Sequence, residues 1–253
     1  MLYYIYDSTY EGLFTAVFEA FSRKEKPDRM INEKESIPFF TDVFHVITDD
    51  EKAARVAAGL QKKLSPSAFR MLSICFLSEQ PDMEMQIFNY ICKAMASSIS
   101  IELNFADDDV LTLSKTYKRV TWEAVRMKQF VRFQKSVDGI YFALIDPQYD
   151  VLPLCYEFFE DRYADQPWII YDKKRRYGIY YNKEKSEIVH FDKLNVSLET
   201  GKLGGDQSDE EEQAFQALWK DYLKAATIQQ RKNLRLQRQH MPKRYWKYLT
   251  EKQ

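Results

Sequence analysis

The spacing of apolar residues changes once along this chain, and that change sets the fold class. In residues 1–121, apolar side chains recur every three to four positions, as in amphipathic helices. In residues 128–192, they come in short alternating runs, as in half-buried strands. We therefore expect an α+β protein with a helix-rich N-terminal half and a small antiparallel sheet in residues 128–192, followed by a basic helical tail.

Capping signals and short apolar runs divide the first half. The signals are Ser8 with Glu11, Thr48 with Glu51, and Ser65 with Pro66, and each is expected to begin a helix. Further helices are expected around residues 85–95 and from residue 107 to residue 124. Residues 2–6 and 43–47 are predicted strands, and residues 27–36 are a predicted loop.

The second half alternates strand and turn signals around one helix. Strands are predicted at residues 130–134, 141–145, 168–171, 177–181 and 188–191, with a helix at residues 152–163. The order β-β-α-β-β-β favours an antiparallel sheet with the helix on one face. We therefore divide the chain into residues 1–121 and residues 122–253, which form either two domains or one continuous domain.

The net charge of −1, from 37 Lys and Arg against 38 Asp and Glu, hides an uneven distribution. Residues 219–253 hold ten basic residues and two acids, a charge of +8, so the remaining 218 residues carry −9. Residues 115–135 add seven basic residues against one acid, Glu123. Such asymmetry within a neutral total suggests a face that binds a polyanion.

Three basic segments supply the candidate nucleic-acid-binding residues. They are Arg126, Lys128 and Arg132; Lys173, Lys174, Arg175 and Arg176 on a predicted hairpin turn; and Arg231, Lys232, Arg235, Arg238, Lys243, Arg244, Tyr245, Trp246 and Lys247 in the tail. On one helix, Arg231, Arg235 and Arg238 would form a stripe that tracks phosphates. Tyr245 and Trp246 are candidates for base stacking, or alternatively they anchor the tail to the core, and basic helix faces are often simply solvated.

No motif for a metal or a cofactor is recognisable, so we expect neither. His45, His190 and His240 lack metal-ligand spacing, and glycine-rich phosphate loops and nucleophile motifs are absent from the sequence. Cys75, Cys92 and Cys155 have apolar neighbours and are expected to be buried thiols, which favours a reducing cytoplasm. No apolar run reaches the roughly 18 residues of a membrane span, and the N-terminus lacks the features of a signal peptide.

Carboxylates are the remaining candidates for catalysis. A helix cap explains Asp107–Asp109 better than a Mg²⁺ site does, because consecutive helical residues diverge by about 100° each. Asp161, Asp165 and Asp172 have arginines nearby in the sequence, so ion pairs explain them at least as well as catalysis. The acidic run Asp209–Glu212 either opens a helix or folds back on the basic tail.

Four stretches of the chain resemble a bacterial family labelled probable DNA metabolism proteins. They are residues 6–21, 126–133, 153–181 and 231–251, and the string PKRYWKYL at residues 242–249 is the most specific. The resemblance implies a partner, because members of that family are typically encoded beside a radical SAM protein with DNA-binding character. A similar domain also occurs joined to uracil-DNA glycosylase domains. The resemblance thus implies a DNA-repair or DNA-modification context, and it transfers no catalytic residue.

The sequence leaves three functions open. The first is an accessory nucleic-acid-binding protein that presents DNA or a damaged base to a partner enzyme. The second is an enzyme acting on DNA, such as a nuclease or a glycosylase-like protein, whose acids converge beside the basic face. The third is a scaffold whose basic tail docks an acidic protein. One continuous groove formed by the three basic segments would favour the first.

Overall fold

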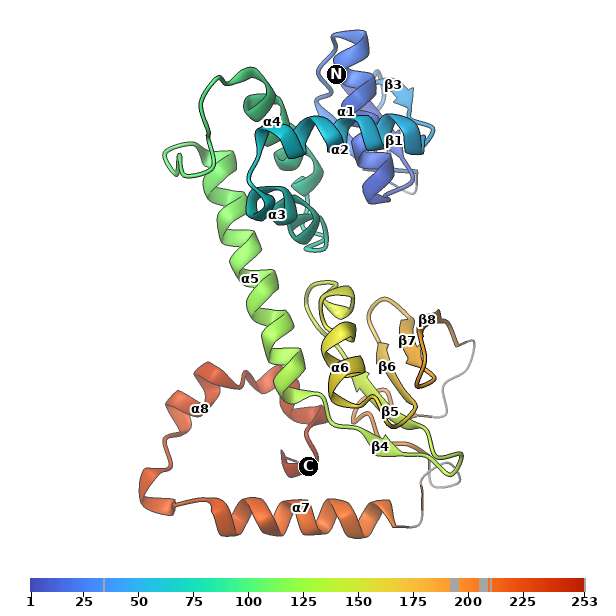
Figure 1. The fold of residues 1–253 in the computed structure, drawn as a ribbon, viewed down its shortest axis with the longest axis vertical. Coiled ribbons are helices and arrows are strands. Elements are labelled where there is room, and N and C mark those ends of the chain that lie inside the picture. Colours follow the sequence, from blue (N-terminus) through green and yellow to red (C-terminus); the bar gives the residue numbers. More distant parts are fainter. Residues whose placement is uncertain (34, 192–195, 205–208, 210, 253) are drawn as a thin grey trace. The chain divides into compact units, whose positions relative to one another are not determined.

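The computed structural model describes residues 1–33, 35–191, 196–204, 209 and 211–252 (Figure 1). The chain separates into two compact units, Met1–Thr121 and Trp122–Gln253. Each unit combines helices with a small sheet, so the fold class is α+β, as the apolar spacing predicts.

The N-terminal unit contains a three-stranded parallel sheet. Its strands are β1 (Leu2–Tyr6), β2 (Arg29–Asn32) and β3 (Asp42–His45), in the order β2-β1-β3. β1 and β3 lie where the apolar runs predict strands. β2 instead falls in the predicted loop, because this charged segment becomes a strand through its pairing with β1, and a sequence pattern cannot show that pairing.

Four helices accompany that sheet: α1 (Tyr10–Arg23), α2 (Asp50–Lys63), α3 (Pro66–Phe76) and α4 (Met83–Ala96). Ser65 caps α3 as predicted. The other two predicted starts are wrong by one residue, because Thr9 caps α1 and Asp49 caps α2. An N-cap residue needs extended backbone, which Thr9 has, whereas Ser8 has a positive φ of 60°.

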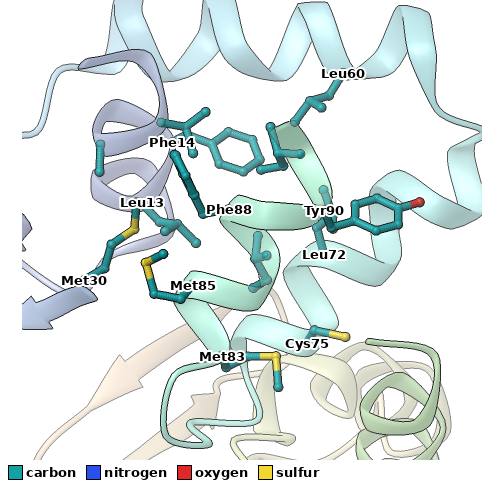
Figure 2. Close-up of a cluster of buried hydrophobic side chains, with 14 of the residues drawn as sticks. Leu13, Phe14, Met30, Leu60, Leu72, Cys75, Met83, Met85, Phe88 and Tyr90 are labelled. Atoms are coloured by element: carbon teal, nitrogen blue, oxygen red, sulfur yellow. The ribbon is translucent and has the colours of Figure 1, made fainter. Parts of the chain in front are cut away.

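The core of the N-terminal unit draws side chains from the sheet and from several helices (Figure 2). Leu13 and Phe14 from α1, Leu72 from α3 and Phe88 from α4 are all buried in it. These residues recur at the helical spacing seen in the sequence, so each helix contributes one apolar face.

A longer helix, α5 (Asp108–Phe130), leads into the C-terminal unit, whose sheet has five strands. They are β4 (Gln134–Lys135), β5 (Tyr141–Ile145), β6 (Trp168–Asp172), β7 (Tyr177–Tyr181) and β8 (Ser186–Val189), side by side in chain order. The predicted order of strands and helix is confirmed. The strand predicted at residues 130–134 shrinks to β4, because α5 continues to Phe130.

The expectation of a wholly antiparallel sheet is wrong at one pair. β5 and β6 run parallel, whereas β4–β5, β6–β7 and β7–β8 are antiparallel. Between β5 and β6 the chain passes through the turn η1 (Leu152–Leu154) and the helix α6 (Tyr156–Arg162). A crossover of that length returns the chain to the starting end of the sheet, which a tight hairpin cannot do.

Strand alternation gives this sheet two buried faces. The ring of Trp168 packs against that of Phe159 on α6, with 6.1 Å between the ring centroids. Phe142, Leu144 and Tyr171 form a separate cluster, against which the ring of the tail residue Tyr248 packs. Alternate residues of a strand point to opposite faces, so α6 and the tail residue Tyr248 pack on opposite faces of the sheet.

The tail folds as a series of short helical segments: α7 (Glu212–Ala226), η3 (Gln229–Arg231), α8 (Leu234–His240), η4 (Lys243–Tyr248) and η5 (Thr250–Lys252). The predicted stripe on one helix is wrong, because Asn233 accepts the N–H of Leu236 and starts α8 after Arg231. Of the three arginines in that stripe, Arg235 and Arg238 share a helix.

Candidate nucleic-acid interface

Glu123 joins the tail to α5. Its side chain is 1% exposed, and its Oε1 accepts hydrogen bonds from Nη2 of Arg244 at 2.7 Å and from the hydroxyl of Tyr245 at 2.8 Å. The N–H groups of Gln148 and Tyr149 donate to its two oxygens at 3.0 and 3.1 Å. A buried carboxylate needs such partners, because burying an unpaired charge is costly. The acid that stands out in a basic stretch of sequence therefore has a structural role.

Asp172 organises the turn between β6 and β7 in the same way. Its buried carboxylate accepts the N–H groups of Lys174 and Arg175 at 2.8 and 3.1 Å, and Nη1 of Arg175 at 2.7 Å. Burial raises the pKa of Asp172 despite these hydrogen bonds. Arg175 also donates to the carbonyls of Pro147 and Gln148, so this arginine is committed to the turn.

Asp146, which directly follows β5, holds η4. Its Oδ2 accepts hydrogen bonds from Nζ of Lys247 at 2.8 Å and from the hydroxyl of Tyr248 at 3.2 Å. Burial alone would raise the pKa of Asp146, but the bonds from Lys247 and Tyr248 outweigh burial and lower it. These contacts place the basic end of the tail beside the loop that follows β5.

The loop after β5, the β6–β7 turn and η4 line an open hollow of about 560 Å³, here called the basic pocket. Its lining residues are Asp146, Pro147, Gln148, Lys174, Lys243, Arg244 and Lys247. Four cations thus converge on a space that holds one carboxylate. Lys243 is exposed and forms no ion pair with any residue that the structure describes. The pocket brings together two of the three predicted basic segments, the hairpin turn and the tail.

The third segment, on and after the end of α5, lies outside the basic pocket. Arg126 lines a different cleft, between α5 and α8. Nζ of Lys128 lies 5.6 Å from the ring centroid of Phe158. Arg132 forms a 2.8 Å ion pair with Glu251 near the end of the tail. Burial would raise the pKa of Glu251, but the hydrogen bond from Arg132 keeps it below its ordinary value.

The other predicted cations lie outside the basic pocket. Arg231 and Lys232 line a larger cleft beside α7, of about 850 Å³, together with Lys220, Lys224 and Lys252. Arg176, Arg235 and Arg238 are exposed. Lys173 lies next to the basic pocket in sequence, but its Nζ donates to the backbone carbonyl of Leu198.

The two candidate stacking residues have different environments. Tyr245 is buried, its ring centroid lies 5.9 Å from that of Phe130, and its hydroxyl is bonded to Glu123. Burial also raises its pKa. Tyr245 therefore anchors the tail to the core, and no base could reach its ring. Trp246 is half-buried, and its Nε1 donates to the carbonyl of Met241 at 3.0 Å.

The acids considered for catalysis do not form a shared site. Asp161 and Asp165 are exposed, whereas the carboxylate of Asp172 is buried against Arg175. Asp107 and Asp109 both pair with Lys93, at 2.6 and 2.7 Å. Among the described residues there is no group of three or more His, Cys, Asp or Glu side chains that could hold a metal ion.

The acidic run before α7 contacts β4. Asp209 pairs with Nζ of Lys135 at 2.9 Å, and the buried Glu212 accepts the N–H of the same lysine at 3.0 Å. Glu210 of this run lies outside the described residues. Asp209 thus neutralises the charge of Lys135, whereas Glu212 binds the backbone of the same residue.

The cysteines are largely sequestered. Cys75 and Cys155 are buried, and burial raises the pKa of each thiol to about 12. Cys92 is half-buried, so the expectation of three buried thiols holds for two of them. In the part of the chain that the structure describes, no helix is both long and apolar enough to cross a membrane.

The sequence was compared with models of known protein families, and one of them matches. Residues 81–251, which include α4, α5, the five-stranded sheet and the tail, match the model of a domain of unknown function, DUF4130. The chain belongs to this family. No match was found among curated proteins, and none among solved structures. The basic pocket and the residues that build it all lie inside the DUF4130 region.

The sequence could not identify two of the acids that position side chains at this candidate interface. Glu123 is distinctive in the sequence as the one acid among seven basic residues of residues 115–135. No sequence pattern predicts that its side chain is buried. Asp146 lies in an ordinary loop, and the tail it binds is 101 residues further along the chain.

Proposed function

We propose that the C-terminal unit of this DUF4130 protein binds nucleic acid through the basic pocket. The observation that carries the proposal is the convergence of Lys174, Lys243, Arg244 and Lys247 on one hollow. Such a cluster suits the binding of phosphate, because lysine and arginine side chains donate charge-assisted hydrogen bonds to its oxygens. Asp146 and Glu123 hold two of these cations in place, so the pocket is organised before any ligand arrives.

The proposed role is that of an accessory protein in DNA repair or DNA modification. The resemblance to probable DNA metabolism proteins supports this context and suggests a radical SAM protein as partner. On this proposal, the DUF4130 protein supplies contacts to the nucleic acid, and its partner supplies the reaction. The placement of the carboxylates gives no comparable support to an enzymatic role, because Asp172 is buried and occupied by Arg175.

The test is fluorescence anisotropy of a labelled DNA at increasing salt. Affinity should fall steeply, since each phosphate contact on duplex DNA contributes about 0.9 to the slope of log affinity against log salt. Lys243→Ala and Lys174→Ala should each weaken binding and lower that slope by about 1. Lys62→Ala, an exposed lysine of α2 in the other unit, is the matched control. Absent or salt-independent binding, with the partner protein also supplied, would overturn the proposal.

A further inference from the structure

A second cleft, between the end of α5 and α8, has an aromatic side chain at its surface. It measures about 410 Å³, and Trp122, Arg126 and Gln129 line it from α5, while Gln237 and His240 line it from α8. Trp122 is 62% exposed. An indole ring normally buries a large apolar area, so one left open beside a cleft suggests a ligand-binding role.

The side chains around Trp122 have the chemistry that recognises a nucleobase. Trp122, Arg126 and Gln129 stand at i, i+4 and i+7 and therefore share one face of α5. The indole offers a flat π-face, the guanidinium offers a cation, and the amide offers both a donor and an acceptor. Arg126 forms no ion pair with a residue in the described ranges.

The cleft and the basic pocket are neighbours along the tail. His240 ends α8 at the cleft, and Lys243 of the basic pocket follows three residues later. Consecutive Cα atoms are about 3.8 Å apart, so these two residues are at most about 11 Å apart along the backbone. One strand could therefore place a phosphate in the pocket and a nearby base in the cleft.

We propose that the Trp122 cleft holds an unpaired nucleobase, so that the substrate class of this interface is single-stranded nucleic acid or a duplex with an extruded base. In the interior of an intact duplex, both faces of each base are stacked on neighbours, so the ring of Trp122 cannot reach them. This inference rests on the proposed function, because the basic pocket supplies the phosphate contacts.

The test compares a labelled single strand of mixed sequence with the blunt duplex of the same strand. Trp122→Ala should weaken binding of the single strand by about 5- to 150-fold, the range for loss of one stacked base, and leave duplex binding unchanged. Trp122→Phe should restore most of the affinity, since a phenyl ring still stacks. Phe215→Ala on α7 is the matched control, because that aromatic side chain is 60% exposed and lies outside the cleft.

The outcomes separate this inference from the proposed function. Wild-type protein that binds neither probe at low salt overturns both. Binding that Lys243→Ala weakens and Trp122→Ala leaves intact overturns the stacking inference alone. An equal loss on single strand and duplex also overturns it, because the ring would then contribute without regard to pairing. Circular dichroism and thermal unfolding of Trp122→Ala should match those of wild type, since the side chain is exposed.

Discussion

Glu123 on α5 and Arg244 in η4 are 121 residues apart in sequence, and their side chains meet at 2.7 Å. The side chain of Glu123 is buried, while that of Arg244 remains 43% exposed and lines the basic pocket. The same contact therefore holds the tail against α5 and positions Arg244 at the edge of the basic pocket. On the proposed function, this pair would therefore contribute both to stability and to binding.

Glu123→Ala should destabilise the C-terminal unit. Removing one partner of a buried ion pair costs roughly 3–5 kcal/mol, and the exposure of Arg244 favours the lower end, about 3 kcal/mol. The substitution also leaves the N–H groups of Gln148 and Tyr149 without their acceptor. Urea unfolding measures the loss. The exposed Asp161→Asn should change stability by less than about 0.5 kcal/mol. If the two variants were equally stable, the contacts of Glu123 with the tail would not stabilise the C-terminal unit.

The β6–β7 turn should depend on Asp172 in two separable ways. Asp172→Asn keeps an oxygen for the N–H groups of Lys174 and Arg175 but loses the charge pair with Arg175. Asp172→Ala loses both. We expect the free energy of unfolding to fall by about 1–2 kcal/mol in Asp172→Asn and by about 3 kcal/mol or more in Asp172→Ala. Denaturant titrations of both variants would measure these losses, and an Asp172→Asn variant less stable than Asp172→Ala would contradict this order.

Acid should remove the stabilisation that Glu251 gives the tail. The folded pKa of Glu251 lies below its ordinary value of 4.5, because the bond from Arg132 outweighs burial. The stability from this group is therefore present above that ordinary value and is lost as pH falls through the folded pKa. The difference in unfolding free energy between wild type and Glu251→Gln should be largest near about pH 7 and shrink by about pH 3. A difference that grows in acid would show the opposite sign of the shift.

Gly178 on β7 should not tolerate a side chain. A Cβ atom there would lie 2.8 Å from the backbone oxygen of Ile170 and 3.0 Å from the ring of Tyr171. Gly178→Ala should therefore destabilise the protein by about 1–3 kcal/mol, the usual cost of overpacking. Gly59 on α2 is the matched control, since a Cβ there meets Met95 at 3.8 Å. Gly59→Ala should stabilise the helix by about 0.5–1 kcal/mol. Thermal unfolding tests both expectations: the melting temperature should fall in Gly178→Ala and rise in Gly59→Ala.

Much of the local structure follows from short-range patterns. Apolar spacing predicts the α+β class, the order of elements in residues 128–192 and most helices, because a helix or strand buries one face and the spacing records it. Ser65 before Pro66 marks the start of α3 correctly, since capping involves only neighbouring residues. The clustering of positive charge in the tail is likewise visible in the sequence alone.

Tertiary structure decided the features that depend on distant partners. β2 is a strand because β1 lies beside it, and β5 runs parallel to β6 because α6 intervenes. Tyr245 and Trp122 are both aromatic residues near cations, yet one is buried and the other exposed. That difference is set by which surfaces meet when the tail closes on α5 and on the sheet. Apolar spacing and charge counts do not encode such long-range contacts, so the sequence identified the basic segments and the fold determined which of them converge.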